Sequence, residues 1–94
     1  MSIEDFHGPH PKPPKEGHAR IDWSEPAGRS VSSRVRAHTC GCEPTTYELL
    51  AAGGLGLIRQ TERTATGDRV SESPWSRAAE AKGLWNDLLE GNAR

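Results

Sequence analysis

The sequence predicts an α+β fold: a three- or four-stranded antiparallel meander with one C-terminal amphipathic helix packed on it, after a disordered N-terminal arm. Three observations lead to this prediction. Segments of alternating apolar and polar residues are separated by glycine-centred breaks. A serine–proline pair then precedes apolar residues at helical spacing. The first 28 residues, in contrast, are rich in proline and glycine.

The chain divides into an arm over residues 1–28, a single small module over 29–91 and a tail over 92–94. The arm has few large apolar residues, so it cannot bury enough surface to offset the entropy lost on ordering. About 60 residues then remain to fold, and a module of that size is marginally stable unless it is stapled or oligomeric.

The first strand is expected between Val31 and Thr39. Apolar or small residues alternate there with Arg34, Arg36 and His38, which predicts a half-buried strand with a basic outer face. The segment Cys40-Gly41-Cys42-Glu43-Pro44 then breaks the pattern.

Residues 45–61 allow two interpretations. A helix is one, because Thr45 and Glu48 form a capping box and Gly53 could end it. The favoured one is a hairpin folded at Gly53-Gly54, which sets Glu48 opposite Arg59 and Leu50 opposite Leu57. Cross-strand pairs of that kind each contribute about 0.2–1 kcal/mol.

A second hairpin is expected to turn at Gly67-Asp68, which would bring Ala65 near Val70 and Arg63 opposite Glu72. The helix is expected to follow at once, with Ser73 as its cap and Pro74 in its first turn. Its apolar stripe comprises Trp75, Ala78, Ala81, Trp85, Leu88 and Leu89, and Gly91 is expected to end it.

Charge and hydropathy exclude several classes of protein. The net charge is −1, which disfavours partners held mainly by charge, such as bulk nucleic acid or an anionic membrane. The N-terminus is polar and acidic, unlike a signal peptide. The longest apolar run, Leu49–Ile58, is too short to span a membrane. We therefore expect a cytoplasmic protein without membrane contact.

His38, Cys40 and Cys42 are the candidate metal ligands. On a continued strand their side chains would share one side, and Gly41 would let the chain curl around an ion. Zinc binds thiolate and imidazole donors, so zinc is the expected ion. A fourth ligand could come from His7, His10 or His18 of the arm, or from a second subunit. Inert thiols and a redox or intersubunit disulfide are the alternatives.

A partner surface is also predicted, because arginine is the only base in residues 29–70. Its members would contact phosphates or a protein partner, or would be ordinary surface charges paired with acids. Trp23 lies just before the module and would anchor either the arm or a partner. The five arginines of this surface are Arg34, Arg36, Arg59, Arg63 and Arg69.

Several short strings stand out in residues 45–94: Tyr47-Glu48-Leu49, Ala51-Ala52-Gly53-Gly54, Ile58-Arg59, Ser71-Glu72-Ser73-Pro74, Leu84-Trp85 and Leu88-Leu89. In these strings the chain resembles small uncharacterised proteins of high-GC bacteria. Nine arginines against three lysines agree with such an origin. The resemblance implies no function.

A second resemblance concerns the strand arginines followed by Glu80-Ala81 in the helix. This outline is similar to three-stranded DNA-binding sheets with a trailing helix, as in integrase arm-binding domains, whose exposed sheet face enters the major groove. The dense basic and aromatic strand residues of that family are missing here. A winged helix would require residues 45–53 to be helical and two more helices upstream, which residues 1–28 do not offer.

No spacing of serine, histidine and acid indicates a nucleophile, and Gly53-Gly54 lacks the lysine–serine ending of a phosphate loop. We therefore expect a non-catalytic regulatory or accessory module that binds a protein partner, as a monomer or a homodimer. The alternatives are a DNA-binding protein that uses the arginine surface and a small zinc-binding domain; no cofactor other than that zinc is expected.

Overall fold

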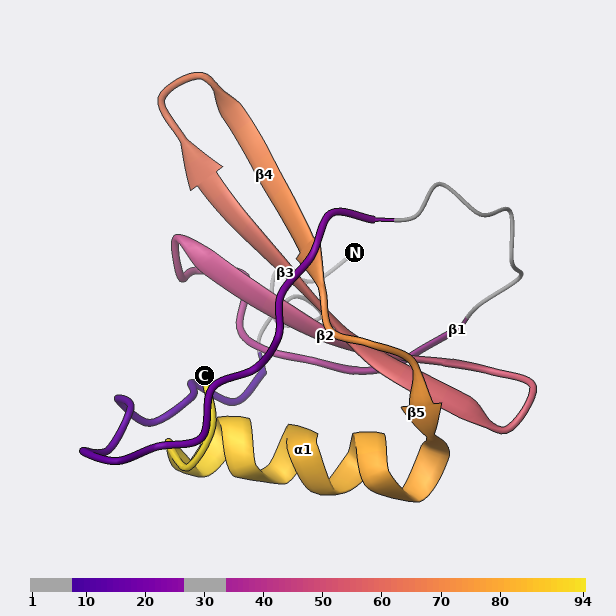
Figure 1. Cartoon of the computed structure of the whole chain (residues 1–94). Coiled ribbons are helices and arrows are strands. Elements are labelled where there is room, and N and C mark those ends of the chain that lie inside the picture. Colours follow the sequence, from indigo (N-terminus) through magenta and orange to yellow (C-terminus); the bar gives the residue numbers. More distant parts are fainter. Residues whose placement is uncertain (1–7, 27–33) are drawn as a thin grey trace.

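The computed structural model describes residues 8–26 and 34–94. Its sheet is an antiparallel meander in the order β1-β2-β3-β4, and a short β5 pairs with the start of β3. One helix, α1, packs across a single face of the sheet (Figure 1). The predicted α+β meander with a C-terminal helix is confirmed. The elements are β1 Arg34–His38, β2 Thr45–Ala52, β3 Leu55–Thr64, β4 Gly67–Glu72, β5 Ser76–Arg77 and α1 Ala78–Glu90.

The β2–β3 hairpin has the predicted register. Glu48 lies opposite Arg59 and Leu50 opposite Leu57. Gly53 and Gly54 have φ values of 55° and 83°, the left-handed pair that a tight two-residue hairpin turn requires. The strand interpretation of residues 45–53 is therefore correct, and the winged-helix option, which needed a helix there, is wrong.

The β3–β4 hairpin turns two residues earlier than expected. Thr64 pairs with Gly67, so Ala65 and Thr66 form the turn in place of Gly67-Asp68. The Thr64 side chain closes this turn, because its hydroxyl donates to the Gly67 carbonyl and accepts from the Thr66 amide. The predicted pairing of Arg63 with Glu72 is consequently wrong.

A bulge in β1 breaks the predicted alternation. Val35 lies opposite Leu50 and Ala37 opposite Leu49, so Arg36 is the extra residue between them. Val35 and Ala37 therefore point to opposite faces of the sheet, and Val35 is 51 % exposed. The predicted residues Val31 to Ser33 lie outside the described part of the chain.

The helix begins later than predicted. Ser73 does not cap it: its hydroxyl accepts a hydrogen bond from the Ile58 amide at 2.8 Å, and its own amide donates to the Ile58 carbonyl. Ser73 thus extends the sheet, the chain stays extended through β5, and α1 starts at Ala78. Trp75 precedes the helix and is 37 % exposed, so it is not part of the apolar stripe.

The core lies between α1 and the sheet face that it covers, here called the helix face. Its buried members are Ile21, Tyr47, Ile58, Trp85, Leu88 and Ala93. Close approach of the helix depends on Gly56, because a Cβ there would lie 2.8 Å from the Ala81 Cβ. The helix ends as predicted at Gly91, which is left-handed with φ of 81°.

The described part of the predicted arm, residues 8–26, lies against the module and bends at Glu16-Gly17 (Figure 1). Backbone amides of Lys12, Lys15 and Ala19 donate to carbonyls of Leu89, Gly91 and Asn92, at 2.8–2.9 Å. Composition alone predicted disorder here. Backbone bonding to the helix end supplies the contacts that the few apolar side chains do not.

Polar contacts reinforce this arrangement. Lys12 forms an ion pair with Glu90 at 2.8 Å, and the ammonium holds the pKa of that carboxyl below its usual value. The residues expected to form a tail are also bound, since Ala93 is buried and the Arg94 amide donates to the Ala19 carbonyl. In the described ranges, no helix has both the length and the apolar character that crossing a bilayer requires.

Two glycine substitutions test the packing of α1. Gly56→Ala should destabilise the protein by about 1–3 kcal/mol, because the new methyl group collides with Ala81 and the Leu50 carbonyl. Gly83→Ala is the matched control, since Gly83 lies in the helix with open space around it; it should stabilise the fold by about 0.5–1 kcal/mol. Urea denaturation followed by circular dichroism measures both, and equal effects would contradict the packing.

Candidate metal centre

Hydrogen bonds hold both sides of the turn that connects β1 to β2. Thr39 is buried; its amide donates to the Tyr47 carbonyl and its hydroxyl accepts from the Tyr47 amide, both at 2.9 Å. Cys40, next in the chain, is 1 % exposed. The chain therefore turns inward at Cys40 and no longer follows the period of two that a strand would impose.

Arg63 of β3 closes the far side of this turn. Its guanidinium donates to the Gly41 carbonyl at 2.8 Å, and its amide donates to the Pro44 carbonyl at 2.9 Å. These bonds hold the segment that carries Cys42 and Glu43 above the buried Cys40.

The N-terminal segment reaches the same turn. The Cys40 amide donates to the Pro9 carbonyl at 3.1 Å, which places His10 beside the cysteines. Gly8 makes this approach possible, because a Cβ there would lie 2.7 Å from the His38 carbonyl oxygen. Any larger residue would push the segment away from the end of β1.

His10, Cys40 and Cys42 form one group, with all three candidate ligand atoms within 4.8 Å of one another. The two sulfurs are 3.1 Å apart, and the Cys42 sulfur is 3.5 Å from the His10 Nε2. Two residues of the group are exposed and Cys40 is buried, so the group opens toward solvent on one side.

Glu43 fixes the orientation of the histidine. Its carboxylate lies 2.5 Å from the His10 Nδ1, so the ring directs Nε2 at the sulfurs. A carboxylate on the far nitrogen of a ligating histidine is the usual second partner in metal sites. The same hydrogen bond raises the pKa of His10 above its ordinary value.

Two of the distances in the group can be compared with those expected for a tetrahedral zinc ion and for a disulfide. Zinc bound to sulfur and nitrogen donors would set the Cys42 sulfur about 3.5 Å from the histidine nitrogen, as observed, and the sulfurs about 3.8 Å apart. The sulfurs would have to separate by about 0.7 Å to reach that geometry. A disulfide would need them to close by about 1 Å, to about 2.05 Å.

The surroundings of the Cys42 thiol favour its protonated form. The hydrogen bond that it shares with Cys40 raises the pKa of the Cys42 thiol, and loss of hydration acts in the same direction. A reactive cysteine needs a lowered pKa, because the thiolate is the attacking species. Metal binding would instead displace the proton of each thiol.

His38 is not part of the group, and its prediction as a ligand is corrected. Its Nδ1 lies 3.0 Å from the Thr39 carbonyl, at the end of β1. The alternation that would have aligned it with Cys40 stops where the chain turns inward. Among the arm histidines His10 takes this place; His18 instead bonds to the Lys15 carbonyl, and His7 lies outside the described residues.

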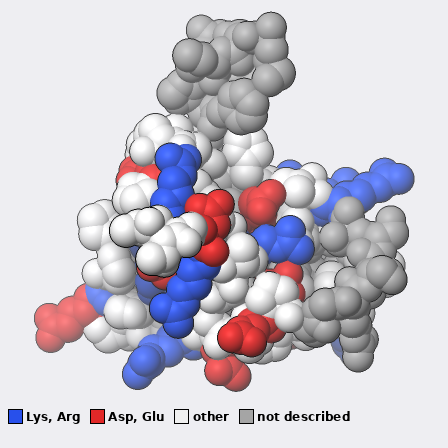
Figure 2. Space-filling model, turned by 90° about the horizontal axis from the view of Figure 1, so that it is seen from above, with Lys and Arg blue, Asp and Glu red and all other residues white. Residues whose placement is uncertain are grey.

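The predicted arginine surface is divided between two faces. Arg59 and Arg63 lie on the outer face of the sheet, which is the face opposite the helix face. Arg69 lies on the helix face, opposite Glu62. Arg59 contacts Glu72 at 3.1 Å. Basic and acidic side chains are interspersed on the side of the molecule away from α1 (Figure 2). Arg34 and Arg36 belong to a separate feature, a groove beside α1.

Trp23 anchors the N-terminal segment on the core. Its ring packs against Tyr47, with centroids 6.0 Å apart, and its indole donates to the Arg94 carbonyl at 3.1 Å. Of the two anchoring roles expected for Trp23, the structure shows the intramolecular one.

Comparison with known proteins finds no match: no family model, curated protein or solved structure matches this chain.

The pairing of His10 with Glu43 predicts a measurable pKa. In the metal-free protein, nuclear magnetic resonance titration should give His10 a pKa above 6.5, and Glu43→Gln should lower it. The His10 pKa is higher in the folded protein than in the unfolded chain. The pair therefore stabilises the fold fully when the pH lies below the unfolded-state pKa of His10, and this stabilisation is lost as the pH rises through the folded-state pKa. A His10 pKa unaffected by Glu43→Gln would refute the pairing.

Proposed function

We propose that this protein is a non-catalytic zinc-binding module in which His10, Cys40 and Cys42 hold the ion. The observation that carries the proposal is the convergence of one imidazole nitrogen and two sulfurs from segments thirty residues apart in sequence. Glu43 adds support, because a metal-ligating histidine usually bonds through its other ring nitrogen to a carboxylate, a carbonyl or water.

The donor set favours zinc. Two thiolates and one imidazole are soft to borderline donors, which select zinc over magnesium or calcium. Three protein ligands leave the fourth tetrahedral position for a donor from outside. His10 and Glu43 keep 54 % and 39 % of their side chains exposed, so solvent or a partner's side chain can reach that position.

Such an ion would act as a staple. It would join the N-terminal segment to the β1–β2 turn, adding to the backbone hydrogen bond between Cys40 and Pro9 and the contact between His10 and Glu43. Zinc binding energy then becomes folding energy, which matters in a module with a small core.

The other functions expected from the sequence receive uneven support. DNA binding would need the arginines on one face, and the register distributes them over two. Binding of a protein partner, alone or through a homodimer, remains a prediction.

Zinc titration of the reduced, metal-free protein tests the proposal. Native mass spectrometry should show one zinc ion per chain, and calorimetry should give one site. His10→Gln and Cys42→Ser should each weaken binding by more than the about 10–100-fold that loss of an outer-shell partner costs, because each removes a ligand. Both positions are exposed, so the variants should fold.

His18→Gln and His38→Gln are the matched controls, since both rings bond to backbone carbonyls and neither belongs to the group. Both should bind zinc as the parent protein does. A parent protein that takes up no zinc, or a His10→Gln variant that binds it unchanged, would refute the proposed function.

A further inference from the structure

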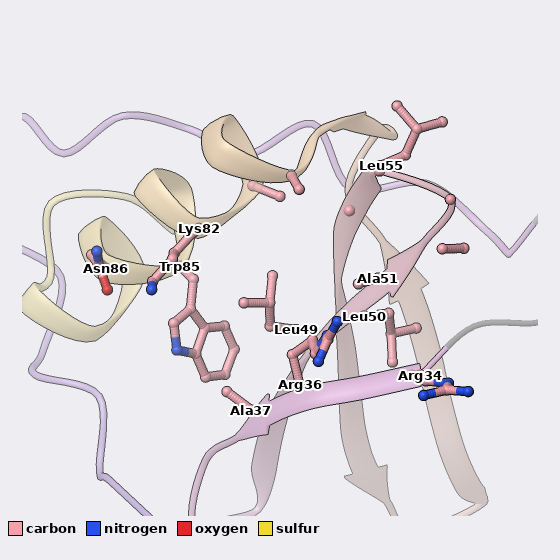
Figure 3. Close-up of a pocket in the computed structure, with 16 residues that line it drawn as sticks. Arg34, Arg36, Ala37, Leu49, Leu50, Ala51, Leu55, Lys82, Trp85 and Asn86 are labelled. Atoms are coloured by element: carbon pink, nitrogen blue, oxygen red, sulfur yellow. The ribbon is translucent and has the colours of Figure 1, made fainter.

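A groove runs between α1 and the β1 side of the sheet (Figure 3). Its volume is about 740 Å³, within the range of about 300–1,000 Å³ that small-molecule sites occupy. It involves none of the three candidate zinc ligands. It is therefore a separate feature of the fold.

Small residues create the hollow. Ala37, Ala51 and Ala78 line it, together with the glycines of the β2–β3 turn. The indole of Trp85 points from α1 toward Ala37 of β1, and Leu49 lies beside the indole (Figure 3). Large side chains at the alanine positions would fill this space. The groove thus presents an aromatic and aliphatic floor.

Basic side chains surround this floor. Arg34 and Arg36 come from β1 and Lys82 from α1, while no Asp or Glu is among the described residues that line the groove. None of these three bases takes part in an ion pair within residues 8–26 and 34–94. This distinguishes them from Arg59, which Glu72 neutralises.

The β1 bulge contributes to this arrangement. Arg34 lies opposite Ala51 on the helix face, and Arg36 is the extra residue of the bulge. Without the bulge, Ala37 would share a face with Val35 and could not lie under Trp85. The bulge thus allows both the basic edge and the apolar floor of the groove.

We propose that this groove binds a small organic anion with an apolar body, such as a carboxylate bearing an alkyl or aryl chain. The anionic group would meet the guanidinium groups of Arg34 and Arg36, which can each offer two parallel donors. The apolar chain would cover Trp85 and Leu49. Three uncompensated bases around a low-dielectric floor attract anions and repel cations of equal size.

Decanoate and decyltrimethylammonium are the matched probes, because they share a chain and differ in charge. The full chain should bind decanoate below the critical micelle concentration of decanoate. The bound decanoate should displace anilinonaphthalene sulfonate, a fluorescent apolar anion, from the groove. Decyltrimethylammonium should not compete. In ¹⁵N spectra, the indole signal of Trp85 should shift on decanoate addition, whereas those of Trp23 and Trp75, which do not line the groove, should stay in place.

Charge variants locate the anion. Arg36→Gln and Lys82→Gln should each weaken decanoate binding by about fivefold. Arg69→Gln is the control, because Arg69 is exposed on β4 outside the groove. It should bind as the parent does. Equal binding of the two probes, or an Arg36→Gln affinity equal to that of Arg69→Gln, would overturn the proposal, whatever the outcome of the zinc titration.

Discussion

The left-handed end of α1 at Gly91 is the constraint on which the placement of the candidate metal centre depends. Gly91 turns the chain so that the carbonyls of Leu89, Gly91 and Asn92 face the N-terminal segment. Its missing side chain also leaves room for the Pro13 carbonyl. The segment can therefore bond along the helix end and continue to Pro9 and His10. A side chain at this position would displace it.

Local signals predicted much of the fold. Gly53-Gly54 specified the β2–β3 turn, and cross-strand pairs such as Glu48 with Arg59 gave its register. Competing hydrogen bonds account for the errors. Ser73, chosen as a helix cap, bonds to Ile58 instead, because a serine hydroxyl can satisfy either a helix end or a neighbouring strand.

The candidate metal centre was predictable only in part. Cys40 and Cys42 were identified from their spacing, and His10 was one of three arm histidines considered. Nothing local distinguished His10 from His18, because the choice depends on backbone bonds to residues far along the chain. Glu43 was missed as the partner of His10, although its position next to Cys42 was the available signal.

Amide hydrogen exchange of the zinc-free protein tests most directly whether the fold itself delivers His10 to the cysteines. The amides of Lys12, Lys15 and Ala19 should be protected, since each donates to a carbonyl beyond the end of α1 or in its last turn. The Glu16 amide, which makes no backbone bond within the described residues, should exchange freely. Free exchange at all four positions would contradict the account, because His10 would then have no fixed place beside Cys40 and Cys42.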